Sequence, residues 1–278
     1  MVKINELLKR SDIEIREAIL ILCKLLNVDK SYIFTYGERK VSDSIGKEFL
    51  HLTSKRKAGY PIQYILGEKE FMGIGFFVED GVLIPREDTE TLVNYVIKYV
   101  EDKYQKKRVE ILDLGFGSGA ISISLAYYLK NAQLYGVDIS SDAYRIANIN
   151  KERLALENVS FLKGDLFKGL DENEIPQVFD IIVSNPPYIE SDIIDTLDRE
   201  VRDFEPRLAL DGGHDGLLFY REITSMSKNY LKKDGLLICE IGYNQGSVVK
   251  NMFESRGYRD INVLKDLSGN DRVVFGFK

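Results

Sequence analysis

The chain has 278 residues, of which 44% are hydrophobic and 29% are charged, and its formal net charge at pH 7 is −6. This composition is typical of a soluble globular protein that can hold one large domain and a small one. No stretch approaches the ~20 apolar residues of a membrane-spanning helix and the N-terminus has no cleavable apolar run, so we expect a cytoplasmic protein. With two histidines and two cysteines, a zinc site or a histidine-based triad is not expected, and we predict no metal.

Residues 1–60 carry amphipathic patterns that predict a small helical domain. Ser11–Glu14 has the pattern of a capping box, which would open a helix that runs to about Leu26. A short helix is expected over Ser31–Thr35 and a longer one over Ser42–Lys57. The pattern leaves two alternatives open for this domain: a module that binds a partner, or a lid that only stabilises the fold.

Residues 61–85 change to a β pattern. Apolar residues over 71–78 and 82–84 flank the turn signal Glu79-Asp80-Gly81, so we expect a β-hairpin that links two domains. Pro85–Glu90 then opens a helix to about Val100, with acids in its first turn where the helix dipole favours them.

From Val109 onward, strands and helices alternate, which predicts a parallel sheet with helices on both faces. The apolar strand Val109–Leu114 runs into the loop Gly115-Phe116-Gly117-Ser118-Gly119, and a helix follows from Ala120. Glycines in such a loop allow a tight turn and close backbone approach to a nucleotide. A second strand ends in Asp138, where an acid would accept hydrogen bonds from ribose hydroxyls; the alternative is an N-cap for the helix over Ser140–Leu154.

The spacing of the loop glycines distinguishes between cofactors. Behind Asp113 they follow G-x-G-x-G and not the G-x-G-x-x-G of dinucleotide-binding proteins. This spacing resembles that of class I S-adenosylmethionine-dependent methyltransferases. The resemblance implies S-adenosylmethionine as methyl donor, with S-adenosylhomocysteine as product, and the predicted cofactor-binding residues here are Gly115, Phe116, Gly117, Ser118, Gly119 and Asp138.

The strand Phe179–Val183 leads into Ser184-Asn185-Pro186-Pro187-Tyr188, where it must stop because prolines cannot donate to a sheet ladder. Ligands of open parallel sheets bind at the carboxyl ends of the strands, so we expect Asn185 at the active-site rim. The side-chain carbonyl of Asn185 and the backbone carbonyl of Pro186 are two acceptors that fit a planar –NH2 group, and Tyr188 offers a flat face for the group that carries it. We therefore predict Asn185, Pro186 and Tyr188 as catalytic, and these three with Pro187 as substrate-binding. The alternative is a proline-rich loop with a capping Asn.

Residues 189–216 form a long acidic segment, which is typical of a functional loop or cover and unfavourable for a nucleic acid phosphate track. The remaining pattern predicts a helix over Asp215–Tyr230, a strand over Leu236–Ile241 and a second helix over Asn244–Ser255. It then predicts an antiparallel pair of strands, Ile261–Leu264 and Arg272–Phe277, that closes the sheet.

A methyl donor beside a site for an –NH2 group indicates amino-group methylation. The tetrad Asn185-Pro186-Pro187-Tyr188 is similar to that of amino-methyltransferases that act on DNA bases or on protein glutamine. Further stretches resemble one branch, the peptide chain release factor glutamine methyltransferases (PrmC/HemK): Pro61–Gly67, Glu70-Phe71, Leu83–Glu90, Phe204–Leu210, Glu240–Gly246 and Asp271–Val274.

This resemblance implies a Rossmann-like class I α/β fold with a seven-stranded, mostly parallel sheet. It implies a helical substrate-binding domain over residues 1–60, a hairpin linker over 61–85 and a catalytic domain over 86–278. The implied reaction is N5 methylation of the glutamine in the Gly-Gly-Gln motif of peptide chain release factors, which the N-terminal domain would dock. We expect a monomer that binds neither nucleic acid nor membrane directly.

The family pattern also implies further cofactor contacts. Asp165 would lie near the adenine amine, unless it is a plain turn residue, and Leu166 would lie against the ring. Asn185 is expected at the cofactor as well, and Arg86 and Glu90 along the cofactor cleft.

Two alternatives share the tetrad: a glutamine methyltransferase of a ribosomal protein, and a nucleic acid amino-methyltransferase. The net charge of −6 and the lack of a basic recognition domain speak against the second.

Overall fold

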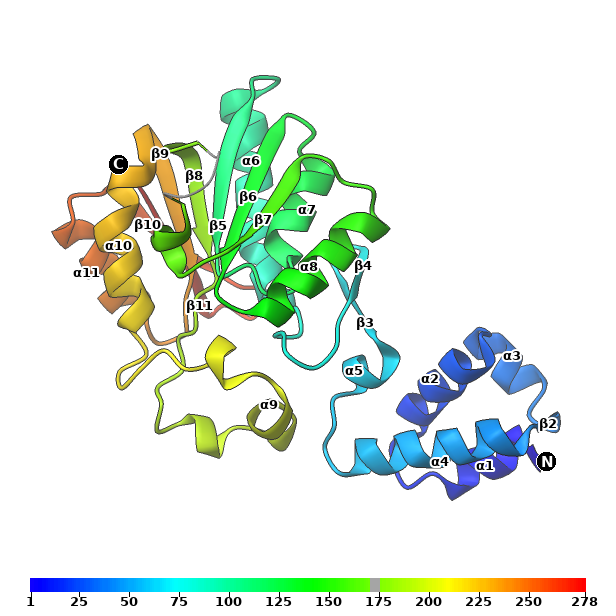
Figure 1. Cartoon of the computed structure of the whole chain (residues 1–278). Coiled ribbons are helices and arrows are strands. Elements are labelled where there is room, and N and C mark those ends of the chain that lie inside the picture. Colours follow the sequence, from blue (N-terminus) through cyan, green and yellow to red (C-terminus); the bar gives the residue numbers. More distant parts are fainter. Residues whose placement is uncertain (171–175) are drawn as a thin grey trace. The chain divides into compact units, whose positions relative to one another are not determined.

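The structure is a computed structural model that describes residues 1–170 and 176–278 (Figure 1). Its contacts divide the chain into two units. The N-terminal unit comprises Met1–Lys69, Val78–Asp80 and Asp198–Phe204, and the sheet unit comprises Glu70–Phe77, Gly81–Leu197 and Glu205–Lys278. Two later segments thus join the helical N-terminal unit, which the sequence pattern does not indicate.

The N-terminal unit is a helical bundle whose apolar core includes Ile4, Leu22 and Phe49. Its helices and its one strand pair are α1 Ile4–Arg10, α2 Ile15–Leu26, α3 Lys30–Thr35, α4 Asp43–Lys57, α5 Ile62–Leu66, β1 Val2–Lys3 and β2 Lys40–Val41. The later segment contributes α9 Arg199–Phe204.

The predicted capping box at Ser11 is wrong. Ser11 follows the last residue of α1, and its hydroxyl donates to the carbonyl of Leu8 at 2.6 Å. Helix α2 begins at Ile15, and Glu14 at its N-cap makes no side-chain capping bond to any described residue. The predicted start of α4 is confirmed, because the Ser42 side chain accepts from the Ile45 N–H.

The predicted hairpin turn at Asp80-Gly81 is also wrong. The strands that pair are β3 Glu68–Phe71 and β4 Ile74–Phe77, and residues 82–84 form no strand. The connection is Met72-Gly73, with φ of 52° and 68°, the positive angles that two-residue hairpin turns require. An Asp-Gly pair and a Met-Gly pair both supply the needed glycine, so the composition of the turn misled the prediction.

The sheet unit confirms the predicted α/β fold. Within the described residues its sheet has seven strands in the order β10-β11-β9-β8-β5-β6-β7. The five strands from β9 to β7 run parallel, and β11 is antiparallel to both of its neighbours. The strands are β5 Val109–Leu114, β6 Ala132–Asp138, β7 Val159–Lys163, β8 Phe179–Ser184, β9 Leu231–Glu240, β10 Arg259–Lys265 and β11 Asp271–Phe277.

Two apolar clusters lie on opposite faces of this sheet, because neighbouring strand residues such as Ile111 and Leu112 point to opposite sides. Helices α6, α7 and α8 cover one face, and α10 and α11 cover the other (Figure 1). The bounds of these helices are α6 Glu90–Tyr104, α7 Ala120–Tyr128, α8 Ser141–Arg153, α10 Leu218–Tyr230 and α11 Gly246–Ser255. The short 3-10 helices are η1 Glu87–Thr89, η2 Leu166–Gly169, η3 Ile194–Thr196 and η4 Arg207–Ala209.

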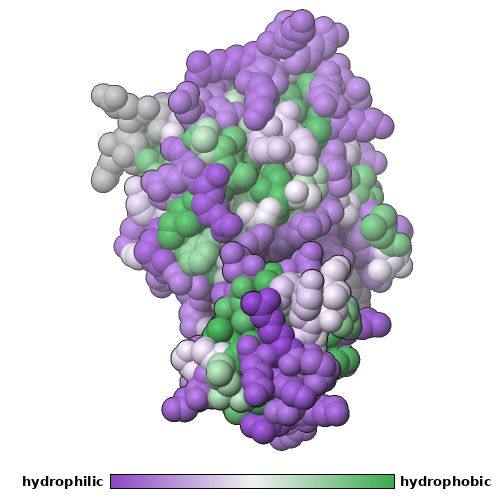
Figure 2. All heavy atoms as spheres, turned by 90° about the vertical axis from the view of Figure 1, so that its right-hand side faces the viewer, coloured by the Kyte–Doolittle hydropathy of each residue, from purple (hydrophilic) through white to green (hydrophobic). Residues whose placement is uncertain are grey.

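Several predicted boundaries shift. Helix α6 continues to Tyr104, beyond the predicted end near Val100, and β9 begins at Leu231, before the predicted start at Leu236. The antiparallel closing pair is confirmed. Among the described helices, none is long and apolar enough to cross a membrane. Figure 2 shows a mostly hydrophilic surface on the viewed side, with hydrophobic residues in scattered patches.

Candidate active site

A cavity of about 320 Å³ opens at the carboxyl ends of β5, β6 and β8 within the sheet unit. Of the residues expected to bind cofactor or substrate, its walls include Gly115, Phe116, Gly117, Ser118, Asp138, Asp165, Leu166, Asn185, Pro186 and Pro187. Gly119 and Tyr188 lie outside this lining. The fold therefore brings together two sequence motifs that are about seventy residues apart along the chain, the glycine loop and the tetrad.

The glycine loop leaves room for a ligand. Gly115 and Gly117 have φ of +78° and +55°, and a Cβ built on either would meet no described atom within 4 Å. Their need for glycine is therefore conformational, and the space beside them is open. Gly119 differs, because a Cβ there would lie 2.7 Å from Ile123 Cδ1 and so obstruct helix packing.

Asp138 ties this loop to the end of β6. One carboxylate oxygen accepts from the Gly117 N–H at 2.9 Å, and the other accepts from the Ser140 N–H at 2.8 Å. Burial raises the pKa of Asp138, while these backbone bonds favour its charged form. The N-cap alternative is wrong, since the Ser140 hydroxyl caps α8 by accepting from the Ala143 N–H.

A second carboxylate lies behind the loop. Asp113 is fully buried, its Oδ2 accepts from the Ser122 hydroxyl at 2.5 Å, and its Oδ1 has no hydrogen-bond partner among the described residues. Burial raises the pKa of Asp113 to about 7. This residue entered the sequence analysis only as the position before the loop.

The remaining predicted cofactor residues lie along the β5–β7 side of the cavity. The ring of Phe116 packs on Phe161 with centroids 4.6 Å apart, and both fill the space beside Gly136, where a Cβ would lie 2.8 Å from each. Asp165 and Leu166 line the same cavity after β7. The Asp165 carboxylate pairs with Lys168 at 2.7 Å and is nearly half exposed, so it can still accept a ligand hydrogen bond.

The tetrad begins where β8 ends. The Ser184 hydroxyl donates to the Leu114 carbonyl at 2.7 Å, which fixes the start of the loop on the neighbouring strand. Asn185 Nδ2 donates to Thr89 Oγ1 at 3.3 Å. Tyr188 packs against the apolar cluster under α10, and burial raises its pKa to about 12. Its backbone carbonyl accepts from Gln245 Nε2 at 3.1 Å, so both the ring and the backbone of Tyr188 are held by residues of the sheet unit.

Arg86 and Glu90 separate in the structure. Arg86 lines the cavity, and its guanidinium Nη2 donates to both carboxylate oxygens of buried Glu205, at 2.6 and 2.7 Å. Glu90 lies outside the lining and accepts from the Met72 N–H at 2.7 Å.

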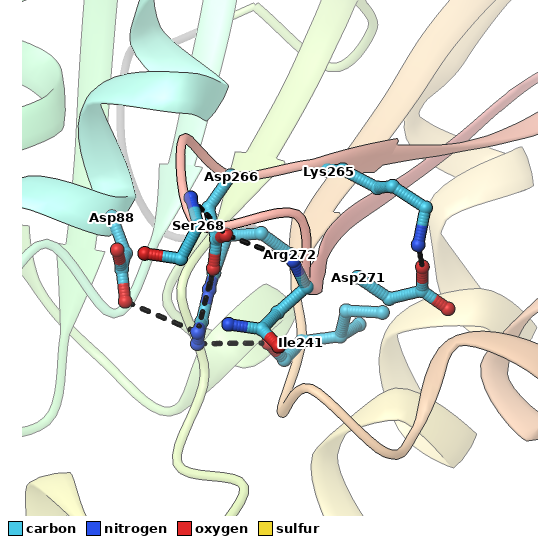
Figure 3. Close-up of polar contacts among 8 residues, drawn as sticks. Asp88, Ile241, Lys265, Asp266, Ser268, Asp271 and Arg272 are labelled. Atoms are coloured by element: carbon cyan, nitrogen blue, oxygen red, sulfur yellow. Dashed lines mark hydrogen bonds and ion pairs between the residues drawn. The ribbon is translucent and has the colours of Figure 1, made fainter.

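Behind Asn185 lies a polar cluster that sequence reasoning missed. Arg272 of β11 reaches Asp88 and Asp266, both at 3.1 Å, and Figure 3 shows its guanidinium between these two carboxylates. Asp88 immediately precedes Thr89, the partner of Asn185. The sequence signal available was a charged residue inside otherwise apolar strands, at Glu240 and Arg272. No cluster of His, Cys, Asp or Glu able to hold a metal occurs in the described part of the chain.

Comparisons with known proteins bear on this site. A family model described as a methyltransferase domain matches residues 105–260, and one described as the PrmC N-terminal domain matches residues 2–67. The release factor glutamine methyltransferase of Clostridium acetobutylicum is 42% identical over 282 residues, which cover 100% of this chain and 97% of that protein. The protein of the same name from Thermodesulfovibrio yellowstonii is 38% identical, with 98% and 95% covered.

A solved methyltransferase structure from Pyrococcus furiosus superposes with a TM-score of 0.54 at 18% identity, and covers 82% of this chain and 98% of that chain. This likeness supports the fold alone. The matched family model and the near full-length relatives show that the chain is an S-adenosylmethionine-dependent methyltransferase that belongs to the release factor glutamine methyltransferase family.

Proposed function

We propose that this chain methylates the side-chain amide nitrogen, N5, of the glutamine in the Gly-Gly-Gln motif of peptide chain release factors. One observation carries the proposal: Asn185 and Pro186 share a cavity with the open glycine loop, and the nitrogen of the Asn185 amide donates to Thr89, which lines the same cavity. That bond leaves the carbonyl end of the Asn185 side chain available to the –NH2 group of a substrate amide.

The chemistry asked of the tetrad is positioning and electrostatics. An amide nitrogen is a weak nucleophile because its lone pair is delocalised into the carbonyl. Hydrogen bonds from its two N–H groups to Asn185 Oδ1 and the Pro186 carbonyl would orient the nitrogen and increase its electron density. Tyr188 lies outside the cavity lining, so we propose that it acts by fixing the loop, and that its predicted ring contact with the amide is the lesser part of its role.

The cavity fits the cofactor that the family uses. Residues 115–118 would lie along the cofactor, with the open space beside Gly115 and Gly117 for close approach, Asp138 for its ribose hydroxyls, and Asp165 and Leu166 for its adenine. S-adenosylmethionine supplies an electrophilic methyl group on a sulfonium sulfur.

For the N-terminal unit we propose docking of the release factor. Its match to the PrmC N-terminal domain supports this role. We further propose that the protein works in the cytoplasm as a monomer, with no direct nucleic acid contact; the acidic net charge supports the last point.

The test is methyl transfer from labelled S-adenosylmethionine to purified release factor, ribosomal protein and duplex DNA in parallel. Label on the release factor that disappears when its motif glutamine is replaced supports the proposal. Label on ribosomal protein or DNA alone refutes the substrate while keeping the fold and the donor.

A further inference from the structure

The tetrad is held at both of its ends. The hydroxyl of Ser184, just before the tetrad, donates to a carbonyl of β5 at 2.7 Å. At the far end, the backbone carbonyl of Tyr188 accepts from Gln245 Nε2 at 3.1 Å. Between these points Asn185 and Pro186 line the cavity. Because each proline ring fixes a φ angle, few backbone angles remain free between the two ends, and the direction of the Pro186 carbonyl depends on what holds Tyr188.

Gln245 joins three backbone segments through one side chain. Its Nε2 donates to the carbonyls of Tyr188 and Gly216, at 3.1 and 3.2 Å, and its Oε1 accepts from the Gly242 N–H at 3.0 Å. The residue is 7% exposed, so it is buried among these partners. They fix the orientation of its amide, because a carbonyl can take only the N–H groups and a backbone N–H can take only the oxygen. Both amide hydrogens are therefore committed to carbonyls, one of which belongs to the tetrad.

The backbone of Gln245 is fixed by the start of α11. Gln245 lies immediately before that helix, its N–H donates to the Gly242 carbonyl at 2.9 Å, and its carbonyl accepts from the Val249 N–H at 3.0 Å. Val249 and Phe253 of the same helix are fully buried in the apolar cluster on this face of the sheet. The Gln245 side chain therefore extends from a rigid element, which precise positioning of another group requires.

The loop over residues 210–216 closes on the same part of the tetrad. The N–H of Ile189, directly after Tyr188, donates into this loop at 3.0 Å, and the Ile189 carbonyl accepts from the Gly212 N–H at 2.8 Å. A Cβ on Gly212 would lie 2.7 Å from Tyr188 Cα, and a Cβ on Gly216 would overlap the Tyr188 carbonyl oxygen. A side chain at either position would therefore displace the backbone of the tetrad.

We propose that Gln245 is a positioning residue for the methyl transfer: with the loop 210–216 it fixes the end of the tetrad and so sets the direction of the Pro186 carbonyl and the Asn185 side chain. Neither Gln245 nor this loop lines the cavity, so both act through the tetrad. The role of the Pro186 carbonyl as an acceptor for the substrate rests on the proposed function, whereas the direction of the tetrad backbone does not.

The experiment uses two variants, each with a matched control. Gln245→Ala removes the amide, and Gly212→Ala crowds the tetrad from the loop. Asn131→Ala is the control for the first, since Asn131 Nδ2 also donates to two backbone carbonyls, at 2.7 and 3.0 Å, just before β6. Gly235→Ala is the control for the second, since a Cβ on Gly235 would lie 2.9 Å from the Lys232 carbonyl oxygen, near the amino end of β8. Neither control residue lines the cavity.

Each variant is assayed for methyl transfer to full-length release factor, with S-adenosylmethionine affinity and Tm from calorimetry. All four variants should have a lower Tm. Gln245→Ala and Gly212→Ala should also lower kcat by roughly 10- to 100-fold, as when reacting groups are misplaced by about 1 Å, with cofactor affinity unchanged. The two controls should keep the wild-type kcat. A wild-type kcat in both Gln245→Ala and Gly212→Ala overturns the proposal, and so do equal losses of kcat in the variants and their controls.

The Pro186 carbonyl offers a measurement that needs no substrate. Pro186 and Pro187 are the only adjacent prolines in the sequence. In protein labelled with ¹³C and ¹⁵N at proline alone, only the Pro186 carbonyl is therefore bonded directly to a labelled nitrogen, and this coupling identifies its resonance. The resonance should shift in Gln245→Ala and Gly212→Ala and stay in place in the two controls.

This measurement separates the positioning role from the proposed function. A shift in both variants, without transfer to release factors by the wild type, refutes the proposed substrate and supports the positioning role. Transfer by the wild type, without a shift in either variant, refutes the positioning role alone.

Discussion

Replacing Asn185 by Ala removes the acceptor that the proposed function requires. It also removes the donor that satisfies Thr89, because Asn185 Nδ2 bonds to Thr89 Oγ1 at 3.3 Å. We therefore expect two separate effects, a loss of turnover and a loss of stability.

The catalytic effect is the loss of one preorganised hydrogen bond at the reacting group, which typically lowers kcat by about 10²- to 10³-fold. The stability effect comes from Thr89, which is almost completely buried and loses a donor. Leaving a buried acceptor unsatisfied costs about 1–3 kcal/mol. For a domain of this size each kcal/mol lowers Tm by about 2–4 °C, so we expect a fall of roughly 2–12 °C.

The assay is methyl transfer to purified release factor, with Tm from calorimetry and cofactor affinity from titration. Asn158→Ala is the matched control, since the Asn158 amide donates to the Ala126 and Ala132 carbonyls at 3.0 Å, at the amino end of β7 and away from the cavity. It should lower Tm and leave kcat unchanged. An Asn185→Ala enzyme within a few-fold of the wild-type kcat would refute the assignment of Asn185.

Gly117→Ala and Gly269→Ala impose the same kind of backbone strain, because the two glycines have φ of +55° and +85° and no described atom lies near the new Cβ. Of these two, only Gly117 lines the cavity. Both variants should lower Tm, and titration should show weaker S-adenosylmethionine binding for Gly117→Ala alone. Asp138→Ala removes the acceptor for the Gly117 N–H. A hydrogen bond to a charged group contributes about 1.5–3 kcal/mol, so we expect the cofactor affinity, measured by the same titration, to fall by roughly 10- to 150-fold. The kcat at saturating cofactor should be retained. The pKa of Asp113 is raised to about 7 in the folded protein. Between the pKa of the unfolded chain and pH 7, Asp113 therefore carries a proton in the folded state that it lacks in the unfolded state. The free energy of unfolding falls as pH rises through this range. Asp113→Asn removes that slope, and denaturant titrations should show the variant gaining stability relative to wild type from pH 5 to pH 8.

The parts of the site that could be predicted are those encoded over a few consecutive residues. The glycine loop, its flanking strand and the double proline each restrict the backbone locally, so their positions follow from the sequence. The alternation of strands and helices then places both motifs at one edge of a parallel sheet, because parallel strands all end at the same edge. The cavity where Gly117 and Asn185 meet follows from these two facts.

The parts that could not be predicted depend on contacts between distant residues. The segment Asp198–Phe204 belongs to the N-terminal unit, where Arg56 pairs with both Glu17 and Glu200, and the ring of Phe204 lies 5.3 Å from that of Tyr60. Nothing in an acidic stretch so far along the chain indicates these partners. The hairpin failed for a different reason, since two glycine-containing turns compete and only the packing of the flanking residues decides between them.

The carboxylates Asp113 and Glu240 could be predicted in part: the sequence shows their positions but not their contacts. Each lies at or near the carboxyl end of an apolar strand, where the periodic pattern assigns it to the core and assigns it no role. Burying a carboxylate is costly, and the raised pKa values of both groups reflect that cost. An ionisable residue that interrupts a buried strand next to a predicted ligand edge therefore signals a functional network, even when its partners are not visible in the sequence. For Glu240 the structure shows burial and the opposing charge of Arg272, and so turns a departure from the apolar pattern into a charged group held inside the sheet.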